Sequence, residues 1–256
     1  MLESNDDILS ISYRSFQHVF PDNKIIDRSL SSSSSKYDII RRYLFTGVLI
    51  HYHLWFLFIV FVLFLFTNFG YWWISFSFVL LYLPSYLNND QFKMGRPWYK
   101  LKTSKLWWLI HKYMQVEAVR THQLNKNKQY IFALHPHGIL ILSRPSLLGG
   151  VWETLFPGVE TRLLAASPLF WIPGCREICL WTGCINATKT IAEKLLKTDV
   201  EINEYNSNGK LSLVIYPGGS KEIFNSDSKS NETILIARQG FVKLAIENGC
   251  DIVPGI

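Results

Sequence analysis

The chain has 256 residues, of which 48% are hydrophobic and 15% aromatic, and its net charge is +6. A chain of this length can bury one sizeable core, and its basic balance favours anionic partners such as membrane headgroups or a phosphate-bearing substrate. No run of Arg and Lys interleaved with aromatic residues occurs, so we expect no nucleic-acid partner. The mean hydropathy of +0.11 is high for a soluble protein and indicates one very apolar segment.

The N-terminal residues 1–40 are polar and of mixed charge, and they contain a run of serines at positions 31–35. Such a segment buries too little apolar surface to offset the entropy of ordering it. We therefore expect a poorly ordered tail, with at most a short helix near residues 11–19.

The apolar segment follows, because residues 43–89 contain no Lys, Arg, Asp or Glu. Residues 44–66 are long enough to cross a bilayer, which takes about 20 residues. A turn at 67–70 leads into a shorter apolar stretch at 71–87, which is broken by Pro84. This pattern predicts a membrane hairpin at residues 41–88, with either two spans or one span and a re-entrant second arm.

Basic residues flank this hairpin on both sides: Arg41 and Arg42 precede it, and Lys93, Arg96 and Lys100 follow it. Because positive residues stay in the cytosol, we expect both ends of the hairpin to lie on the cytosolic side.

Residues 89–256 alternate between strand and helix patterns, which favours an α/β domain. We expect an amphipathic helix at 104–122, lying on the membrane surface or packed on the core. Strands are expected at 129–134, 211–216 and 251–256, and helices at 187–197, with Asn186 as N-cap, and at 239–248, ended by Gly249. A final strand is normally followed by more sheet, so we expect the C-terminal part of this domain to be missing.

The four cysteines, Cys175, Cys179, Cys184 and Cys250, match neither a zinc-ribbon nor a redox spacing. We expect reduced, half-buried thiols. The alternative, a disulfide between two of the first three cysteines, stays open.

The first candidate site is the stretch His135-Pro136-His137-Gly138, which follows a buried strand. Residues at i and i+2 of an extended chain point to one side, so both imidazoles can reach one cleft. Histidine is suited to general-base chemistry near neutral pH. We find no HExxH and no third or fourth ligand, so we expect no metal; the alternative is a strand-end turn with one structural histidine.

The second candidate is the turn Pro217-Gly218-Gly219, followed by Glu222, at the end of the apolar run 211–216. Ligands of open sheets bind at the carboxyl ends of strands, and paired glycines expose amides that hold an oxyanion. Taken alone, an ordinary Pro-Gly turn explains this stretch equally well.

The third candidate is the segment 237–245, in which Arg238 and Lys243 place positive charge around a helix N-terminus. Such an end is a good anion site, although an ordinary amphipathic helix has the same pattern.

These three segments, in this order, resemble the type-2 diacylglycerol acyltransferase family, which includes monoacylglycerol and wax-alcohol acyltransferases. YIFALHPHG and ARQGFVKLAIENGCDIVPGI carry the resemblance. It implies a glycerolipid-acyltransferase-like α/β fold and an O-acyltransferase that moves an acyl group from acyl-CoA, a co-substrate rather than a cofactor, to diacylglycerol. It also implies residence in the endoplasmic reticulum membrane, with the catalytic domain facing the cytosol, or at lipid droplets.

The resemblance also assigns roles to residues. The catalytic set is His137, His135 and Glu222, with His137 as the preferred base, although the sequence does not decide between the two histidines. Gly218 and Gly219 would offer amides to the oxyanion. The substrate-binding set is Pro136, Gly138, Pro217, Gly218, Gly219, Arg238, Gly240, Phe241 and Lys243. The related HxxxxD motif is absent, because Leu140 occupies the position of its Asp.

Several alternatives stay open at this point. The acceptor could instead be monoacylglycerol or a long-chain alcohol, which would give a wax ester. The alternative from a different functional class is a membrane protein that binds lipid without catalysing a reaction. Membrane lipid is an expected partner in each case, and the oligomeric state is left open.

Overall fold

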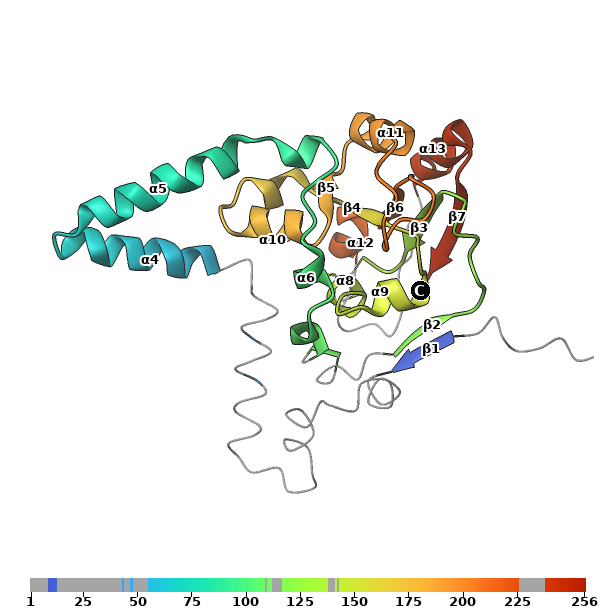
Figure 1. Ribbon diagram of the computed structural model, residues 1–256, viewed down its shortest axis with the longest axis horizontal. Coiled ribbons are helices and arrows are strands. Elements are labelled where there is room, and N and C mark those ends of the chain that lie inside the picture. The colour runs from blue at the N-terminus through green and yellow to red at the C-terminus, as the bar shows by residue number, and fades with distance from the viewer. Residues whose placement is uncertain are drawn as a thin grey trace, which may run out of the picture.

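The computed structural model describes residues 9–12, 43, 47, 55–108, 110–111, 117–137, 141, 143–225 and 238–256. Gly138 and most of the N-terminal tail lie outside these ranges. The described residues form an α/β domain with a pair of apolar helices projecting from it (Figure 1).

A five-stranded parallel sheet lies at the centre of the domain. Its strands are β3 (Tyr130–Leu134), β4 (Thr161–Ala165), β5 (Cys184–Asn186), β6 (Ser212–Ile215) and β7 (Asp251–Gly255). Their order across the sheet is β5-β4-β6-β3-β7, and each neighbouring pair is parallel. The predicted strands at 129–134, 211–216 and 251–256 are confirmed, whereas β4 and β5 were missed.

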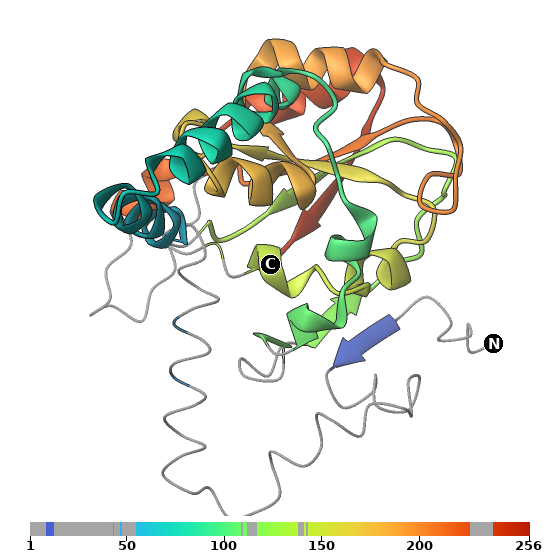
Figure 2. The same cartoon turned by 60° about the vertical axis from the view of Figure 1, so that its left-hand side comes forward.

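Helices cover both faces of the sheet (Figure 2). On β3, Ile131 and Ala133 face a core cluster that includes residues of α11 (Lys189–Lys197) and α13 (Gly240–Asn248). Tyr130 and Phe132 face the opposite cluster, to which α9 (Val151–Leu155) contributes Trp152. Because side chains alternate along a strand, covering on both faces explains why β3 and β6 are almost entirely apolar, with Ser212 as the polar exception.

The two covering helices were predicted nearly correctly. Gly249 ends α13 with φ 64°, the left-handed conformation that glycine adopts without strain. The expected N-cap of α11 was wrong: Thr188 holds that position, and Asn186 is buried at the end of β5.

A second, two-stranded sheet joins the N-terminal region to the domain. Its strands, β1 (Leu9–Ser12) and β2 (Glu117–Arg120), pair in antiparallel fashion. Two expectations need correction here: residues 9–12 of the 1–40 tail form a strand, and the stretch 104–122 is not one helix. It begins with the 3₁₀ turn η4 (Lys105–Trp107), Trp108, Ile110 and His111 are helical as predicted, and Glu117–Arg120 form β2. Pairing with residues over a hundred positions away places Glu117–Arg120 in a strand, despite the local helical pattern.

The projecting helices are α4 (Trp55–Asn68) and α5 (Trp72–Leu87), which pack side by side in antiparallel orientation (Figure 1). Ser75 donates a hydrogen bond of 2.8 Å to the carbonyl of Leu63 and so ties the two helices together. In the part of the chain that the structure describes, no helix is both long and apolar enough to cross a membrane. The described residues thus contain a helical hairpin, and its placement in a membrane stays a prediction.

A buried arginine fastens this hairpin to the domain. Arg176, in α10 (Cys175–Trp181), is fully buried. It donates to the Ser85 carbonyl at 2.8 Å, to Asn88 Oδ1 at 2.7 Å and to Gln91 Oε1 at 3.0 Å. Its charge is balanced by Glu177 at 2.8 Å. These bonds surround the C-terminal end of α5 and the following turn η3 (Asp90–Phe92).

All four cysteines are free thiols, and they are buried rather than half-buried as expected.

Candidate active site

The candidate site lies where two neighbouring strands end. His135 follows the last residue of β3, and Glu222 lies in α12 (Ser220–Asn225), which follows β6 after a tight turn. Because β3 and β6 are adjacent and parallel, their carboxyl ends meet at one edge of the sheet. This edge is where open α/β sheets bind ligands.

A buried carboxylate holds the histidine turn at two points. Glu222 Oε1 lies 2.8 Å from His135 Nδ1, and Glu222 Oε2 accepts a bond of 2.7 Å from the backbone N–H of His137. The Glu222 side chain is 0% exposed, whereas the His135 side chain is 15% exposed. The acid is therefore shielded from water, while part of the imidazole remains accessible.

This pairing distinguishes the two histidines. In the tautomer whose proton is on Nδ1, the Nδ1–H of His135 donates a hydrogen bond to Glu222. Nε2 then has the free lone pair that a general base needs. The backbone N–H of His137 donates to the other oxygen of the same carboxylate. The geometry thus places His135, rather than the preferred His137, in the position of an oriented base.

The His137 ring has a different neighbour. It packs edge-on against Tyr216, with ring centres 5.4 Å apart. The Tyr216 hydroxyl lies 2.8 Å from Ser143 Oγ in α8 (Ser143–Ser146), and burial raises the pKa of Tyr216. Sequence reasoning missed both Tyr216 and Ser143; the only available signal was that Tyr216 precedes Pro217 at the strand end.

The two glycines of the turn have different functions. A Cβ atom on Gly218 would lie 2.1 Å from Glu222 Cδ, so a side chain there would occupy the place of the carboxylate. Gly219 has φ 51°, and its N–H donates to the Tyr216 carbonyl at 3.1 Å. The expectation that both amides serve an oxyanion was therefore wrong for Gly219, whose N–H is used to close the turn.

Of the expected anion-binding residues, Arg238 lies beside the turn: its Nη2 is 3.9 Å from the Cβ position of Gly219. Lys243 is exposed and pairs with Glu247 at 3.7 Å along α13. Gly240 begins α13, and Phe241 packs partly buried against the core. Pro136 is exposed and Pro217 is buried next to Gly218.

The model of the family described as diacylglycerol acyltransferase matches residues 62–256, which is most of the chain. The chain belongs to the diacylglycerol acyltransferase family. The matched region contains the strand-end histidines, the Gly-Gly turn, Glu222 and Arg238.

Curated relatives agree with this assignment. The chain is 31% identical over 170 residues to diacylglycerol O-acyltransferase 2 of Xenopus laevis, which covers 65% of this chain and 45% of that protein. It is 26% identical over 192 residues to 2-acylglycerol O-acyltransferase 1 of Mus musculus, covering 73% and 53%. The chain thus spans about half the length of the relatives it matches. No solved structure matches it significantly.

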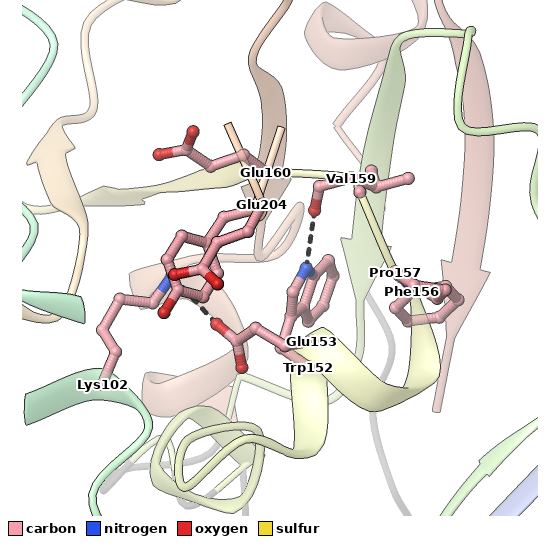
Figure 3. Close-up of a pocket in the computed structure, with 10 residues that line it drawn as sticks. Lys102, Trp152, Glu153, Phe156, Pro157, Val159, Glu160 and Glu204 are labelled. Atoms are coloured by element: carbon pink, nitrogen blue, oxygen red, sulfur yellow. Dashed lines mark hydrogen bonds and ion pairs between the residues drawn. The ribbon is translucent and has the colours of Figure 1, made fainter. Parts of the chain in front are cut away.

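A small cavity of about 70 Å³ lies elsewhere in this diacylglycerol acyltransferase domain (Figure 3). Lys102 and Glu153 line it and form an ion pair of 3.5 Å. Glu160, which precedes β4, lies at the amino end of the sheet, away from His135. Burial lowers the pKa of Lys102; burial alone would raise that of Glu160, but Arg162 and its other partners hold it below its ordinary value. We interpret this group as a neutralised structural cluster.

Among the described residues, no group of three or more His, Cys, Asp or Glu side chains could hold a metal ion.

Proposed function

We propose that this family member transfers a fatty acyl group from acyl-CoA to diacylglycerol and so makes triacylglycerol. The observation that carries the proposal is the His135–Glu222 pair at the strand ends, with 2.8 Å between Nδ1 and Oε1. Family membership supports the reaction class, and the relatives named for diacylglycerol and 2-acylglycerol substrates support a lipid hydroxyl as the acceptor.

The pair supports a direct transfer. His135 Nε2 removes the proton of the lipid hydroxyl while that oxygen attacks the thioester carbonyl. The resulting tetrahedral intermediate collapses, the C–S bond breaks, and the imidazolium returns its proton to the leaving sulfur. The products are an ester and CoA, and the buried Glu222 carboxylate stabilises the imidazolium between the two steps.

Two neighbouring groups are suited to binding negative charge on the substrates. The N–H of Gly218 is the remaining candidate donor to the oxyanion, because the N–H of Gly219 closes the turn. Arg238, beside the same turn, is suited to the phosphates of CoA, because a guanidinium binds phosphate in a bidentate manner.

The proposed location is the endoplasmic reticulum membrane or a lipid droplet, with the α/β domain on the cytosolic side. The α4–α5 hairpin supports it, because Leu81 is 81% exposed and Phe58 is 69% exposed. An apolar surface of this extent favours contact with a membrane. The basic residues that flank the hairpin favour a cytosolic position for both of its ends.

The test measures ester formation in membranes that carry the whole chain, with labelled acyl-CoA and a panel of diacylglycerol, monoacylglycerol and a long-chain alcohol. We expect His135→Ala and Glu222→Gln each to lower the rate by about 10²–10⁴-fold, the usual contribution of general-base catalysis. The matched control is His122→Ala, because His122 is an exposed histidine outside the site. An undiminished rate in His135→Ala would refute the mechanism, and the product profile identifies the acceptor.

A further inference from the structure

A large cavity separates the hairpin from the α/β domain. Its volume is about 790 Å³, within the range of about 300–1,000 Å³ that is usual for ligand sites. Residues of α4 and α5 form one wall, and residues of α6 (Tyr99–Lys102), η4 and α10 form the other. Figure 1 shows the hairpin extending from the domain beside α10.

The hydroxyl and carboxylate groups of the cavity wall have partners within the protein. The Tyr82 hydroxyl donates to Glu177, which also accepts from the Gly174 N–H at 3.1 Å. The Tyr86 hydroxyl donates to a backbone carbonyl at 2.9 Å, and Ser85 Oγ accepts from an arginine at 3.0 Å. The remaining wall is aliphatic and aromatic. An occupant therefore gains dispersion contacts and burial of apolar surface, and it finds few polar groups to bind.

The charge of the cavity wall restricts the chemical class of the occupant further. None of the described residues that line the cavity is Lys or Arg, and its single carboxylate, Glu177, is paired with Arg176. The phosphates of acyl-CoA would find no cation there, whereas Arg238 lies next to the Gly-Gly turn. The described catalytic candidates, including His135 and Glu222, do not line the cavity. The cavity is thus a separate site suited to an uncharged chain.

An apolar surface adjoins the cavity. Val79 and Leu83 of α5 line it, while Leu81 of the same helix points away and is 81% exposed. A lipid chain that lies against the hairpin can enter between the helices and the domain without crossing a charged surface.

We propose that this cavity holds one fatty acyl chain of an uncharged membrane glycerolipid, for which diacylglycerol is the probe. This inference goes beyond the proposed transfer reaction, because binding here needs neither His135 nor Glu222. The hairpin thereby acts as one wall of a lipid site in addition to any role as a membrane attachment.

The experiment uses the whole chain in phosphatidylcholine nanodiscs with a diacylglycerol that carries a diazirine in the middle of one acyl chain. After illumination, mass spectrometry locates the adducts. Adducts on Ile178 and Trp181 of α10 report the cavity, because α10 belongs to the domain and not to the hairpin. The matched variants are Leu83→Trp, which places an indole in the cavity, and Leu81→Trp, which makes the same change on the outer face of α5.

We expect labelling of α10 in the native chain, a fall of about fivefold or more in Leu83→Trp because the indole obstructs the path of an acyl chain between the two walls, and a change within about twofold in Leu81→Trp. Ile178→Trp places an indole in the cavity from the opposite wall and replaces Leu83→Trp if that variant does not fold, with Trp181 as the reporter. The His135→Ala variant should keep the full labelling, so that failure of binding and failure of transfer remain distinguishable.

Three results would overturn the proposal. The first is labelling confined to the outer face of the hairpin, and the second is equal labelling of α10 in the two matched variants. The third is protection of α10 by acyl-CoA that equals or exceeds protection by unlabelled diacylglycerol.

Discussion

Replacing Gly218 with alanine should disable the candidate site through a single methyl group. The added Cβ would lie 2.1 Å from Glu222 Cδ, whereas carbon atoms in contact stay at least about 3.5 Å apart. The carboxylate must therefore retreat by about 1.4 Å. Its bond to His135, now 2.8 Å, would lengthen to about 4.2 Å if the retreat follows the bond, which is beyond hydrogen-bonding distance.

Two consequences follow from this displacement. Loss of the bonds to His135 and to the His137 amide should lower the free energy of unfolding by about 3–6 kcal/mol, because each involves a charged acceptor. Loss of the oriented base should lower the rate of acyl transfer by about 10²–10⁴-fold. Initial rates with labelled acyl-CoA and thermal unfolding of the same preparations measure both quantities.

Gly219→Ala is the comparison that separates displacement of the carboxylate from backbone strain. Its φ of 51° makes alanine unfavourable by about 1–2 kcal/mol. Its Cβ, however, would approach no atom of the described residues more closely than the 3.9 Å to Arg238 Nη2, so Glu222 can stay in place. The reasoning is refuted if Gly218→Ala keeps its rate, or if both variants lose the same amount of activity.

Two further predictions concern stability. Arg176→Met should lower the free energy of unfolding by about 3–5 kcal/mol, because it leaves the buried Glu177 unpaired; the exposed Lys194→Met is the control in denaturant unfolding, and a loss below about 1 kcal/mol would contradict the argument. Burial lowers the pKa of His111, so the unfolded chain takes up its proton first and stability should fall as the pH drops below about 6.5. His111→Gln should flatten that dependence in thermal melts, whereas the exposed His122→Gln should leave it unchanged.

The two strands that end at the candidate site could be predicted from the sequence, whereas two other strands of the sheet could not. The strands that carry it, β3 and β6, are buried on both faces, and their sequences are therefore almost entirely apolar. β4 was missed because Arg162 lies within it, and a charged residue suggests a solvent-exposed position. In the fold, Arg162 is buried against Glu160 at 2.5 Å. β5 has three residues, too few for a pattern to show.

The choice of the base also lay beyond the sequence. His135 and His137 lie in the same short sequence motif, so the sequence does not distinguish them. In the fold, Glu222, more than eighty positions later, contacts the ring of His135 and the backbone N–H of His137. That contact depends on the length of the turn after β6 and on the orientation of α12. Only the folded chain determines both, so the motif alone could not identify the oriented imidazole.

The buried bonds of Arg176 have a mechanical consequence. Because Ser85, Asn88 and Gln91 are all bound to one guanidinium, the hairpin leaves the domain at a fixed angle, with little freedom to swing. A surface that receives the hairpin would then also set the direction in which the strand ends face. The three hydrogen bonds to Arg176 would then set the orientation of the α/β domain relative to a lipid layer. Weakening them would let the domain tilt without changing the residues of the candidate site.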